Sequence, residues 1–128
     1  MRPIDEISSD VIGASMAIHR EIGPGLLESV YEAILARKLG RIGYEVEQQK
    51  PLGFAYDDME FPAAFKVDLL VDRRLIVELK SIDRLQPVHS KQLLTYLRLM
   101  KLPVGLLINF GCDTLKEDIK RVVNNYDD

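Results

Sequence analysis

Apolar residues repeat at helical spacing along the first third of the chain. The first set lies mostly three or four residues apart, which is the spacing of one helical face, and consists of Ile4, Ile7, Val11, Ile18 and Ile22. Residues 23–25, Gly-Pro-Gly, end this pattern because glycine and proline break helices. A second helical pattern runs from Leu27 to Ile42 and is followed by Gly43, where a left-handed cap is expected. The chain therefore begins with two predicted helices.

The period of the pattern changes to two after the second helix. Residues 44–49 alternate as in a half-exposed strand. Pro51 and Gly53 are expected to interrupt this strand, and residues 54–56 are a candidate continuation. Asp57-Asp58 is a candidate turn. This region therefore predicts a short strand with a broken continuation.

Two apolar runs follow, over residues 65–71 and 75–80. Runs that are apolar at consecutive positions are typical of strands buried on both faces. Only residues 72–74, Asp-Arg-Arg, separate the runs, which is a hairpin-sized connection. The two runs are therefore predicted to pair as an antiparallel hairpin inside a sheet.

The last third of the chain predicts a helix and then a strand. A third helical pattern extends from about Pro87 to Lys101 and ends before Pro103. Residues 104–110 form an apolar run typical of a buried strand, while the apolar residues at 115–123 fit either a short helix or a strand. A strand-helix-strand step implies a right-handed crossover between parallel strands. We therefore predict an α/β fold with a mixed central sheet flanked by helices.

Composition limits the class of protein. The chain has 128 residues, 47% apolar and 29% charged, which indicates one globular domain over residues 1–128. The net charge of −3 excludes a basic protein that holds nucleic acid by charge alone. Cys112 is the single cysteine, so an internal disulfide and a Cys-rich zinc site are excluded and a reducing cytoplasm is favoured. With acidic residues near the N-terminus and no long apolar run, we expect no signal peptide and no membrane association.

Three ionisable residues interrupt the most apolar part of the chain. They are Asp68, Glu78 and Lys80, all within the predicted hairpin. If residues 72–74 form a three-residue loop, Asp68 faces Glu78 across the strand pair, and Lys80 shares that face. A two-residue loop would place the two carboxylates on opposite faces. The three-residue register is therefore an assumption of this site.

Two adjacent carboxylates away from water stay ionised only if a nearby positive charge offsets their repulsion. A divalent cation supplies that positive charge, and carboxylate oxygens are ligands that Mg²⁺ and Mn²⁺ prefer. Lys80 can then position a water or meet the charge that grows on a phosphate in attack. The alternative is a structural salt bridge of Lys80 with Asp68 or Glu78.

Asp68 followed by Glu78-Leu79-Lys80 resembles the motif of the PD-(D/E)xK nuclease superfamily, with Val67 in place of the usual proline. Residues 25–31 resemble the GxxExxY signature, which names a family placed in that superfamily, and residues 92–96 resemble the QxxxY element of its exonuclease-like branch. The resemblance runs from about residue 19 to residue 124. It implies a restriction-endonuclease-like core, in which a helix, three strands, a helix and a strand follow one another, here with an extra N-terminal helix.

The resemblance also suggests roles for single residues. Glu28 would be a further acidic metal ligand, direct or through water, and Tyr31 would reach a phosphate or orient Glu28. A core tyrosine with a satisfied hydroxyl is the alternative for Tyr31. Gln92 would contact substrate or water at the metal. Arg37 and Lys38 would hold a phosphate backbone if they flank the pocket, and otherwise form a solvated helix face.

The function that follows is metal-dependent hydrolysis of phosphodiester bonds in nucleic acid, with DNA as the expected substrate. The cofactor would be Mg²⁺ or Mn²⁺. The alternative is a catalytically silent module of the same fold that binds nucleic acid or a protein partner. Small size and negative charge favour that module, or an enzyme that works as a homo-oligomer or with a protein partner. The sequence leaves these alternatives open.

Overall fold

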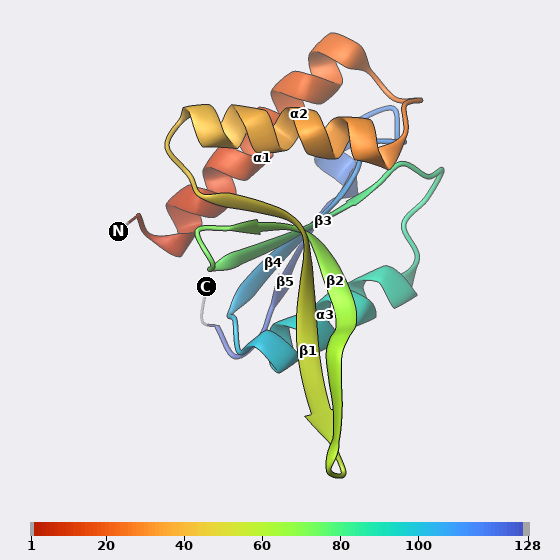
Figure 1. Cartoon of the computed structure of the whole chain (residues 1–128). Coiled ribbons are helices and arrows are strands. Elements are labelled where there is room, and N and C mark those ends of the chain that lie inside the picture. Colours follow the sequence, from red (N-terminus) through yellow and green to blue (C-terminus); the bar gives the residue numbers. More distant parts are fainter. Residues whose placement is uncertain (1, 127–128) are drawn as a thin grey trace.

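The computed structural model describes residues 2–126 of the chain. Its elements in chain order are α1 (Ile4–Ile22), α2 (Glu28–Arg41), β1 (Val46–Tyr56), β2 (Met59–Val71), β3 (Leu75–Lys80), α3 (Pro87–Met100), β4 (Val104–Asn109), the 3-10 helix η1 (Leu115–Asp118) and β5 (Ile119–Val123). The strands form one sheet in the order β1-β2-β3-β4-β5 (Figure 1). Only β3 and β4 run parallel, and they are joined through α3. The predicted mixed α/β architecture is therefore confirmed.

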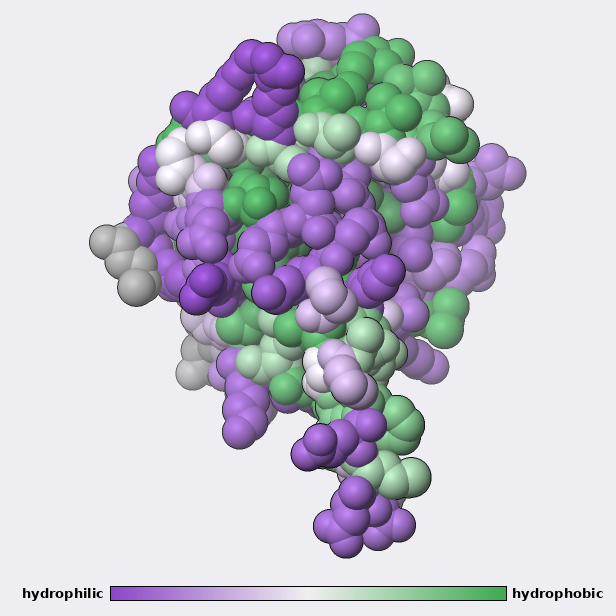
Figure 2. All heavy atoms as spheres, in the orientation of Figure 1, coloured by the Kyte–Doolittle hydropathy of each residue, from purple (hydrophilic) through white to green (hydrophobic). Residues whose placement is uncertain are grey.

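The β1–β2 hairpin is longer than predicted. Strand β1 continues through Pro51 and Gly53, so the expected end of the strand is wrong, but its pairing with β2 shifts register between Leu52 and Phe54. Proline is tolerated there because β1 lies at the edge of the sheet, where a missing N–H leaves no strand unpaired. Asp57 and Asp58 form the turn, both with positive φ. We call residues 50–66 the arm; Figure 2 shows it projecting from the body of the molecule.

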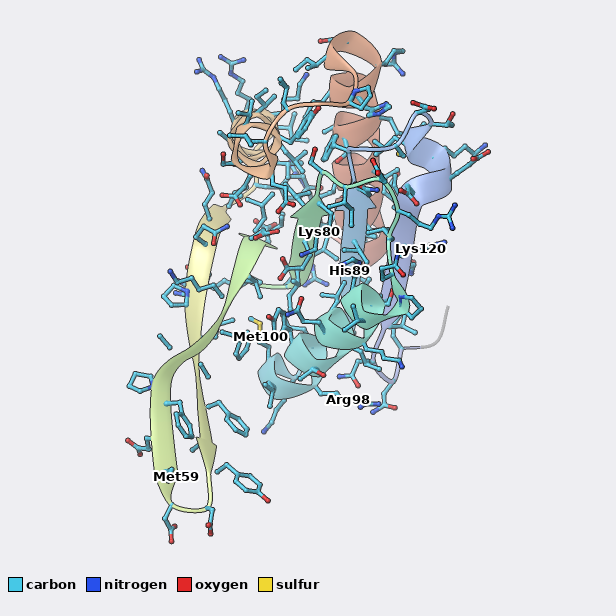
Figure 3. All side chains as sticks on the ribbon, turned by 90° about the vertical axis from the view of Figure 1, so that its right-hand side faces the viewer. Met59, Lys80, His89, Arg98, Met100 and Lys120 are labelled. Carbon is cyan, nitrogen blue, oxygen red and sulfur yellow. The ribbon has the colours of Figure 1, made fainter. Side chains whose placement is uncertain are left out.

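Helices cover the two faces of the sheet (Figure 1). Helices α1 and α2 lie on one face and α3 lies on the other. Leu93 and Leu97 of α3 pack on Ile76 and Leu107 of the sheet. A Cβ at Gly105 would lie 2.9 Å from a methyl group of Leu93, so glycine permits this close approach of α3 to β4. Figure 3 shows Met100, near the end of α3, beside the hairpin, and His89, at its start, away from it.

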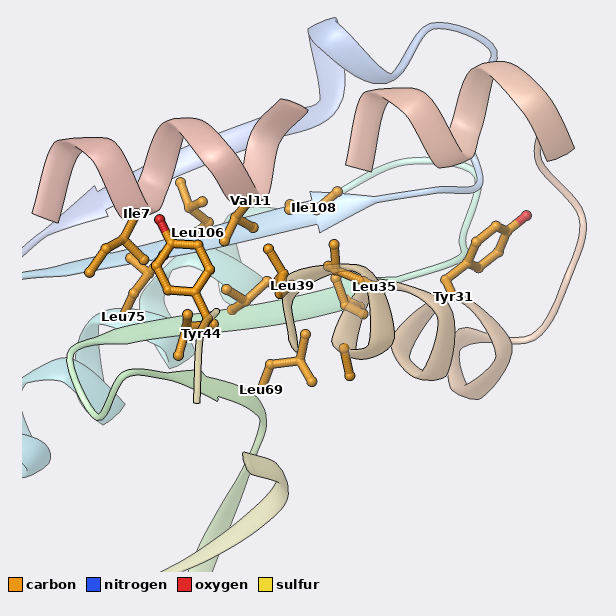
Figure 4. Close-up of a cluster of buried hydrophobic side chains, with 14 of the residues drawn as sticks. Ile7, Val11, Tyr31, Leu35, Leu39, Tyr44, Leu69, Leu75, Leu106 and Ile108 are labelled. Carbon is orange, nitrogen blue, oxygen red and sulfur yellow. The ribbon is translucent and has the colours of Figure 1, made fainter. Parts of the chain in front are cut away.

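The larger core lies between the sheet and helices α1 and α2. Figure 4 shows buried side chains of both helices meeting those of β2, β3 and β4, among them Ile7, Val11, Leu35, Leu39, Leu69, Leu75, Leu106 and Ile108. The apolar stripes read from the sequence are thus the faces that the helices bury. Among residues 2–126, no helix has the length and apolar character that crossing a bilayer requires.

The ends of the elements agree with the sequence patterns. Gly23 and Gly25 have positive φ between α1 and α2, a conformation that glycine adopts without strain. Helix α3 begins with a capping box, in which the Gln86 N–H donates to Nδ1 of His89 at 2.9 Å. Residues 115–123, for which the sequence allowed a short helix or a strand, contain both. The 3-10 helix η1 leads directly into β5, and β5 pairs antiparallel with β4.

Candidate functional site

The loop between β2 and β3 has three residues, as the site requires. Val71 pairs with Leu75 and Leu69 pairs with Val77, and Asp72 in the loop has positive φ. Asp68 and Glu78 therefore face the same side of the sheet. The strands separate beyond Leu69, and the Asp68 side chain takes the place of a strand bond: its Oδ2 accepts the Leu79 N–H at 2.8 Å. The two carboxyl groups thus meet where the sheet opens.

Glu78 is a buried carboxyl group with an incomplete set of partners. Its residue is 8% exposed, and its Oε1 has no hydrogen-bond partner among the described residues. Burial, together with a side-chain hydrogen bond with Asp68 and the Asp68 charge, raises the pKa of Glu78 to about 9, while Lys80 lowers it. The site therefore favours either a proton or a cation on this group.

Glu32 of α2 is joined to Asp68 of β2 through Gln49 of β1, and the sequence reasoning missed both Glu32 and Gln49. Glu32 is 8% exposed, and burial raises its pKa, with further contributions from the charges of Asp68 and Glu28. Gln49 bridges the two elements: its Nε2 donates to Glu32 Oε1 at 2.7 Å and to Asp68 Oδ1 at 3.0 Å. Gln49 has a φ of 49°, in the left-handed region. One amide group thus holds two carboxylates in place.

The residues of the GxxExxY motif connect the start of α2 to the end of β3. The Glu28 Oε2 accepts the Ser81 N–H at 3.3 Å, directly after Lys80. The Ser81 hydroxyl donates to the Leu26 carbonyl at 2.7 Å. Gly25 supplies the positive φ of the loop that makes these contacts possible. Glu28 therefore lies at the edge of the site, but bound to the backbone of Ser81.

Tyr31 is a packing residue. It has 0% exposure, and its ring stacks on Phe110 with centroids 4.4 Å apart. Its hydroxyl donates to the Gly23 carbonyl at 2.6 Å and accepts the Leu26 N–H at 3.2 Å. A ring without exposed surface cannot contact a phosphate, so the substrate-binding role expected for Tyr31 is wrong, and the core alternative describes it.

Helix α3 covers the face of the sheet to which Glu78 points, since Glu78 alternates with Ile76, on which Leu93 and Leu97 pack. Burial raises the pKa of Tyr96, with smaller contributions from the charges of Glu78 and Asp68, and its ring stacks on Phe65. Gln92 is exposed one turn before Tyr96, on the same side of the helix. Gln92 is therefore the α3 side chain of the predicted site that stays available to a ligand.

The basic residues of α2 do not join the site. Arg37 is exposed and follows the buried Glu32 by five residues, which places it about 140° around the helix. Lys38 is half-buried and follows Glu32 by six residues, which turns it about 120° to the other side. The face of α2 that meets the sheet carries Glu32 and Leu35, so the positions of these two residues fit the solvated helix face that was their alternative.

The carboxylates form pairs and not a larger metal-binding group. Within residues 2–126, no three His, Cys, Asp or Glu side chains lie close enough to hold one ion together. The donor set at the opening of the sheet is thus Asp68 and Glu78. Mg²⁺ is commonly held by one or two carboxylates, with water and phosphate oxygens completing its octahedron. The unpartnered Glu78 Oε1 and the raised Glu78 pKa fit such a cation.

A model of the PD-(D/E)XK nuclease superfamily matches residues 5–122 of the chain. The chain belongs to the PD-(D/E)XK nuclease superfamily. The match includes α2, β2 and β3, the elements that meet where the sheet opens. The chain therefore has the fold of this superfamily and is a nuclease-like domain. A comparison with curated proteins finds no match. Asp68 on β2 and the Glu78-Leu79-Lys80 segment on β3, which resemble the superfamily motif in the sequence, both lie within the matched residues.

Glu32 and Gln49, which the sequence reasoning missed, differ in whether the sequence contains a signal for them. Glu32 lies one turn after Glu28 and interrupts the buried stripe that contains Leu35 and Leu39. A charged residue in an apolar stripe is the signal that marks it. Gln49 carries no such signal, because its side chain reaches Glu32 and Asp68 through a left-handed backbone that strand alternation does not predict.

Proposed function

We propose that the protein is a metal-dependent nuclease that hydrolyses phosphodiester bonds in nucleic acid, with DNA as the expected substrate. One observation carries the proposal: the buried, incompletely bonded carboxyl of Glu78 lies beside Asp68 where β2 and β3 separate. Membership of a nuclease superfamily supports this reading of the pair.

Asp68 and Glu78 would hold the cation, Mg²⁺ or Mn²⁺. A cation bound there supplies positive charge at the scissile phosphate and lowers the pKa of water beside it. Asp68 is prepared for this task, because both of its oxygens are already oriented by hydrogen bonds from Gln49 and Leu79. Gln49 is thus a positioning residue, and Glu32 fixes its amide from the other side.

Lys80 acts on the substrate in this proposal. Its ammonium group lies at the end of β3, two residues beyond Glu78 on the same face (Figure 3). There it orients the attacking water and offsets the negative charge that grows on the phosphate. The water oxygen bonds to phosphorus, the bond to the sugar oxygen breaks, and the proton that the water releases is balanced by the proton that the leaving sugar oxygen takes up from solvent.

Two further residues have narrower roles. Glu28 acts through water or by holding the end of β3, because its carboxylate already accepts the Ser81 N–H. Gln92 contacts the nucleic acid from α3. The finer GxxExxY relationship, carried by Gly25, Glu28 and Tyr31, is also a proposal, as is a cytoplasmic location, which rests on the free Cys112.

A catalytically silent binding module is the second candidate. The observation that favours it is the placement of positive charge: Arg37 and Lys38 lie on other sides of α2 than Glu32, and Lys80 lies beside the acidic pair of Asp68 and Glu78. Such a module would keep the fold and bind nucleic acid or a protein without cutting.

A cleavage assay separates the two candidates. Single- and double-stranded DNA and RNA are incubated with the protein in Mg²⁺, Mn²⁺ or chelator. We expect cleavage with metal that chelator and the Asp68→Asn variant abolish. Asp113→Asn, an exposed acidic residue far along the chain, is the matched control and should cut like the wild type. Binding without cleavage of any substrate would favour the module.

A further inference from the structure

The side-chain amide of Asn109, at the end of β4, is buried and completely hydrogen-bonded. The residue has 0% exposure. Its Oδ1 accepts the N–H groups of Ile82 and Gly111, each at 3.0 Å. Its Nδ2 donates to the Ile82 carbonyl at 2.9 Å and to Asp118 Oδ2 at 2.6 Å. An asparagine side chain has two donors and an oxygen with two lone pairs, so every hydrogen bond that it can make is made. We call these four contacts the Asn109 clamp.

The clamp continues the pairing of β3 with β4 beyond the last residues of the two strands. The strands pair in parallel as far as Lys80 and Asn109, and the Phe110 N–H donates to the Lys80 carbonyl at 2.8 Å. After that bond, the Asn109 amide binds both backbone groups of Ile82, as a neighbouring strand would. A Cβ at Gly111 would lie 2.3 Å from the Ile82 carbonyl oxygen, so glycine is required for this contact. The chain that leaves β3 is thus held against β4.

The same stretch of chain is also held from α2. The Ser81 N–H donates to Glu28 Oε2 at 3.3 Å, and the Ser81 hydroxyl donates to the Leu26 carbonyl at 2.7 Å. Paired residues of neighbouring strands share a face of the sheet, so the side chains of Lys80 and Asn109 lie next to each other. Lys80, at the end of β3 (Figure 3), therefore directly precedes two residues whose backbone is fixed from both sides.

Packing alone does not account for an amide at this position. Strand β4 is buried along its whole length. An apolar residue at position 109 would bury more apolar surface and would need no hydrogen-bond partners. A completely bonded polar network instead specifies a single arrangement of the groups around it. Here that arrangement is the path of the chain directly after Lys80.

We propose that Asn109 is a positioning residue for Lys80 and acts through the backbone of residues 80–82. This inference rests on the proposed nuclease function. Lysine has a flexible side chain, so its ammonium group keeps its place only if the backbone that carries it is fixed. Misplacing a reacting group by about 1 Å lowers a rate by about 10²-fold. Asp118 contributes by accepting an Nδ2 hydrogen, which sets the end of the amide that faces the Ile82 N–H.

Cleavage and metal binding should respond differently to loss of the clamp. Asn109→Leu keeps a similar volume and loses all four contacts. Single-turnover cleavage should fall by about 10–100-fold. The affinity for Mn²⁺, measured by isothermal titration, should stay unchanged, because the clamp does not contact Asp68. Equal cleavage rates for wild type and Asn109→Leu would overturn the proposal.

Two further variants separate positioning from general stability. Leu106→Ala opens a cavity on the opposite face of β4 and leaves the clamp intact. At a temperature at which it stays folded, it should cut at the wild-type rate. Asp118→Ala removes one contact of the clamp at a half-buried position and should lower the rate in the same direction as Asn109→Leu, by a smaller factor. A fall in Leu106→Ala as large as that in Asn109→Leu would contradict a specific role.

A double-mutant cycle tests whether Asn109 acts through Lys80. Residues that act as a unit have non-additive effects on the rate. In a Lys80→Ala background, Asn109→Leu should therefore change the residual single-turnover rate by less than about twofold. A merely structural role would slow both backgrounds by the same factor, and that result would overturn the proposal.

The placement of Lys80 is also measurable without cleavage. In protein labelled with ¹³C-lysine, the ε-methylene signal of Lys80 is assigned by its loss in Lys80→Ala. Asn109→Leu should shift this signal, and Leu106→Ala should leave it in place. An unshifted signal in Asn109→Leu would overturn the clamp even in an active nuclease. A shifted signal in a protein that cuts no substrate would support the clamp and refute the proposed nuclease function.

Discussion

The inner and outer halves of the β1–β2 hairpin have opposite chemistry. Between α2 and α3, the inner half carries Gln49 and Asp68 and meets the buried carboxyl groups of Glu32 and Glu78. The outer half, the arm, leaves aromatic residues in water. Charged groups inside and apolar groups outside each cost free energy in the isolated chain. A protein keeps such unfavourable features where binding of a ligand or a partner offsets their free-energy cost. Both halves of the hairpin are therefore candidate functional sites.

Removing Lys80 should have the largest effect at the inner half. Lys80→Ala leaves the carboxylate pair intact but removes the group that meets charge in the transition state. Single-turnover cleavage should fall by about 10²–10³-fold, with metal affinity retained. Lys91→Ala on α3 is the control and should cut at the wild-type rate. Equal rates for wild type and Lys80→Ala would remove Lys80 from the chemistry.

Removing the amide of Gln49 tests whether the carboxylates need to be positioned. Gln49→Leu takes away both donors and frees Asp68 Oδ1 and Glu32 Oε1. Loss of a group that orients a metal ligand costs about 10–100-fold in metal affinity or activity. Isothermal titration with Mn²⁺ measures this change directly. The neighbouring exposed Gln48→Leu should leave the affinity unchanged, and an effect of equal size there would indicate general damage to β1.

Divalent metal should stabilise the inner half and leave the arm unaffected. Only the folded chain brings Asp68 and Glu78 together, so Mn²⁺ at ten times its Kd stabilises the fold by about 1.4 kcal/mol. Thermal unfolding should show a rise of about 4–7 °C. Asp68→Asn should lose this rise, whereas Phe54→Ser/Phe61→Ser should keep it. A transition indifferent to millimolar Mg²⁺ and Mn²⁺ would argue against the metal site.

The protonation of Glu78 should make the stability of the metal-free protein depend on pH. The pKa of Glu78 is raised to about 9 from the ordinary value of 4.5. Between these values the folded state keeps a proton that the unfolded state releases, so stability falls as pH rises through this window. Glu78→Gln should remove that slope and stabilise the metal-free protein at pH 8 by several kcal/mol, because each pH unit above 4.5 costs the wild type about 1.4 kcal/mol. Urea titrations at several pH values measure it, and a wild type with no slope would contradict the raised pKa.

Local patterns in the sequence determined most of the elements and half of the site. The helical repeats predicted α1, α2 and α3 to within a few residues, because each helix buries one stripe against the sheet. The three-residue loop placed Asp68 and Glu78 on one face, since strand register follows from loop length. The superfamily motif could be read from these two facts.

Tertiary structure alone decided how the remaining side chains are used. Tyr31 became a packing residue because its hydroxyl reaches the Gly23 carbonyl across a turn that helix periodicity does not describe. Arg37 faces away from the site because the sheet meets another face of α2. Gln49 contacts Glu32, which lies 17 positions before it in the sequence, and Asp68, which lies 19 positions after it. Periodicity reports which side of an element is buried, whereas a partner far along the chain is set by how the elements pack together.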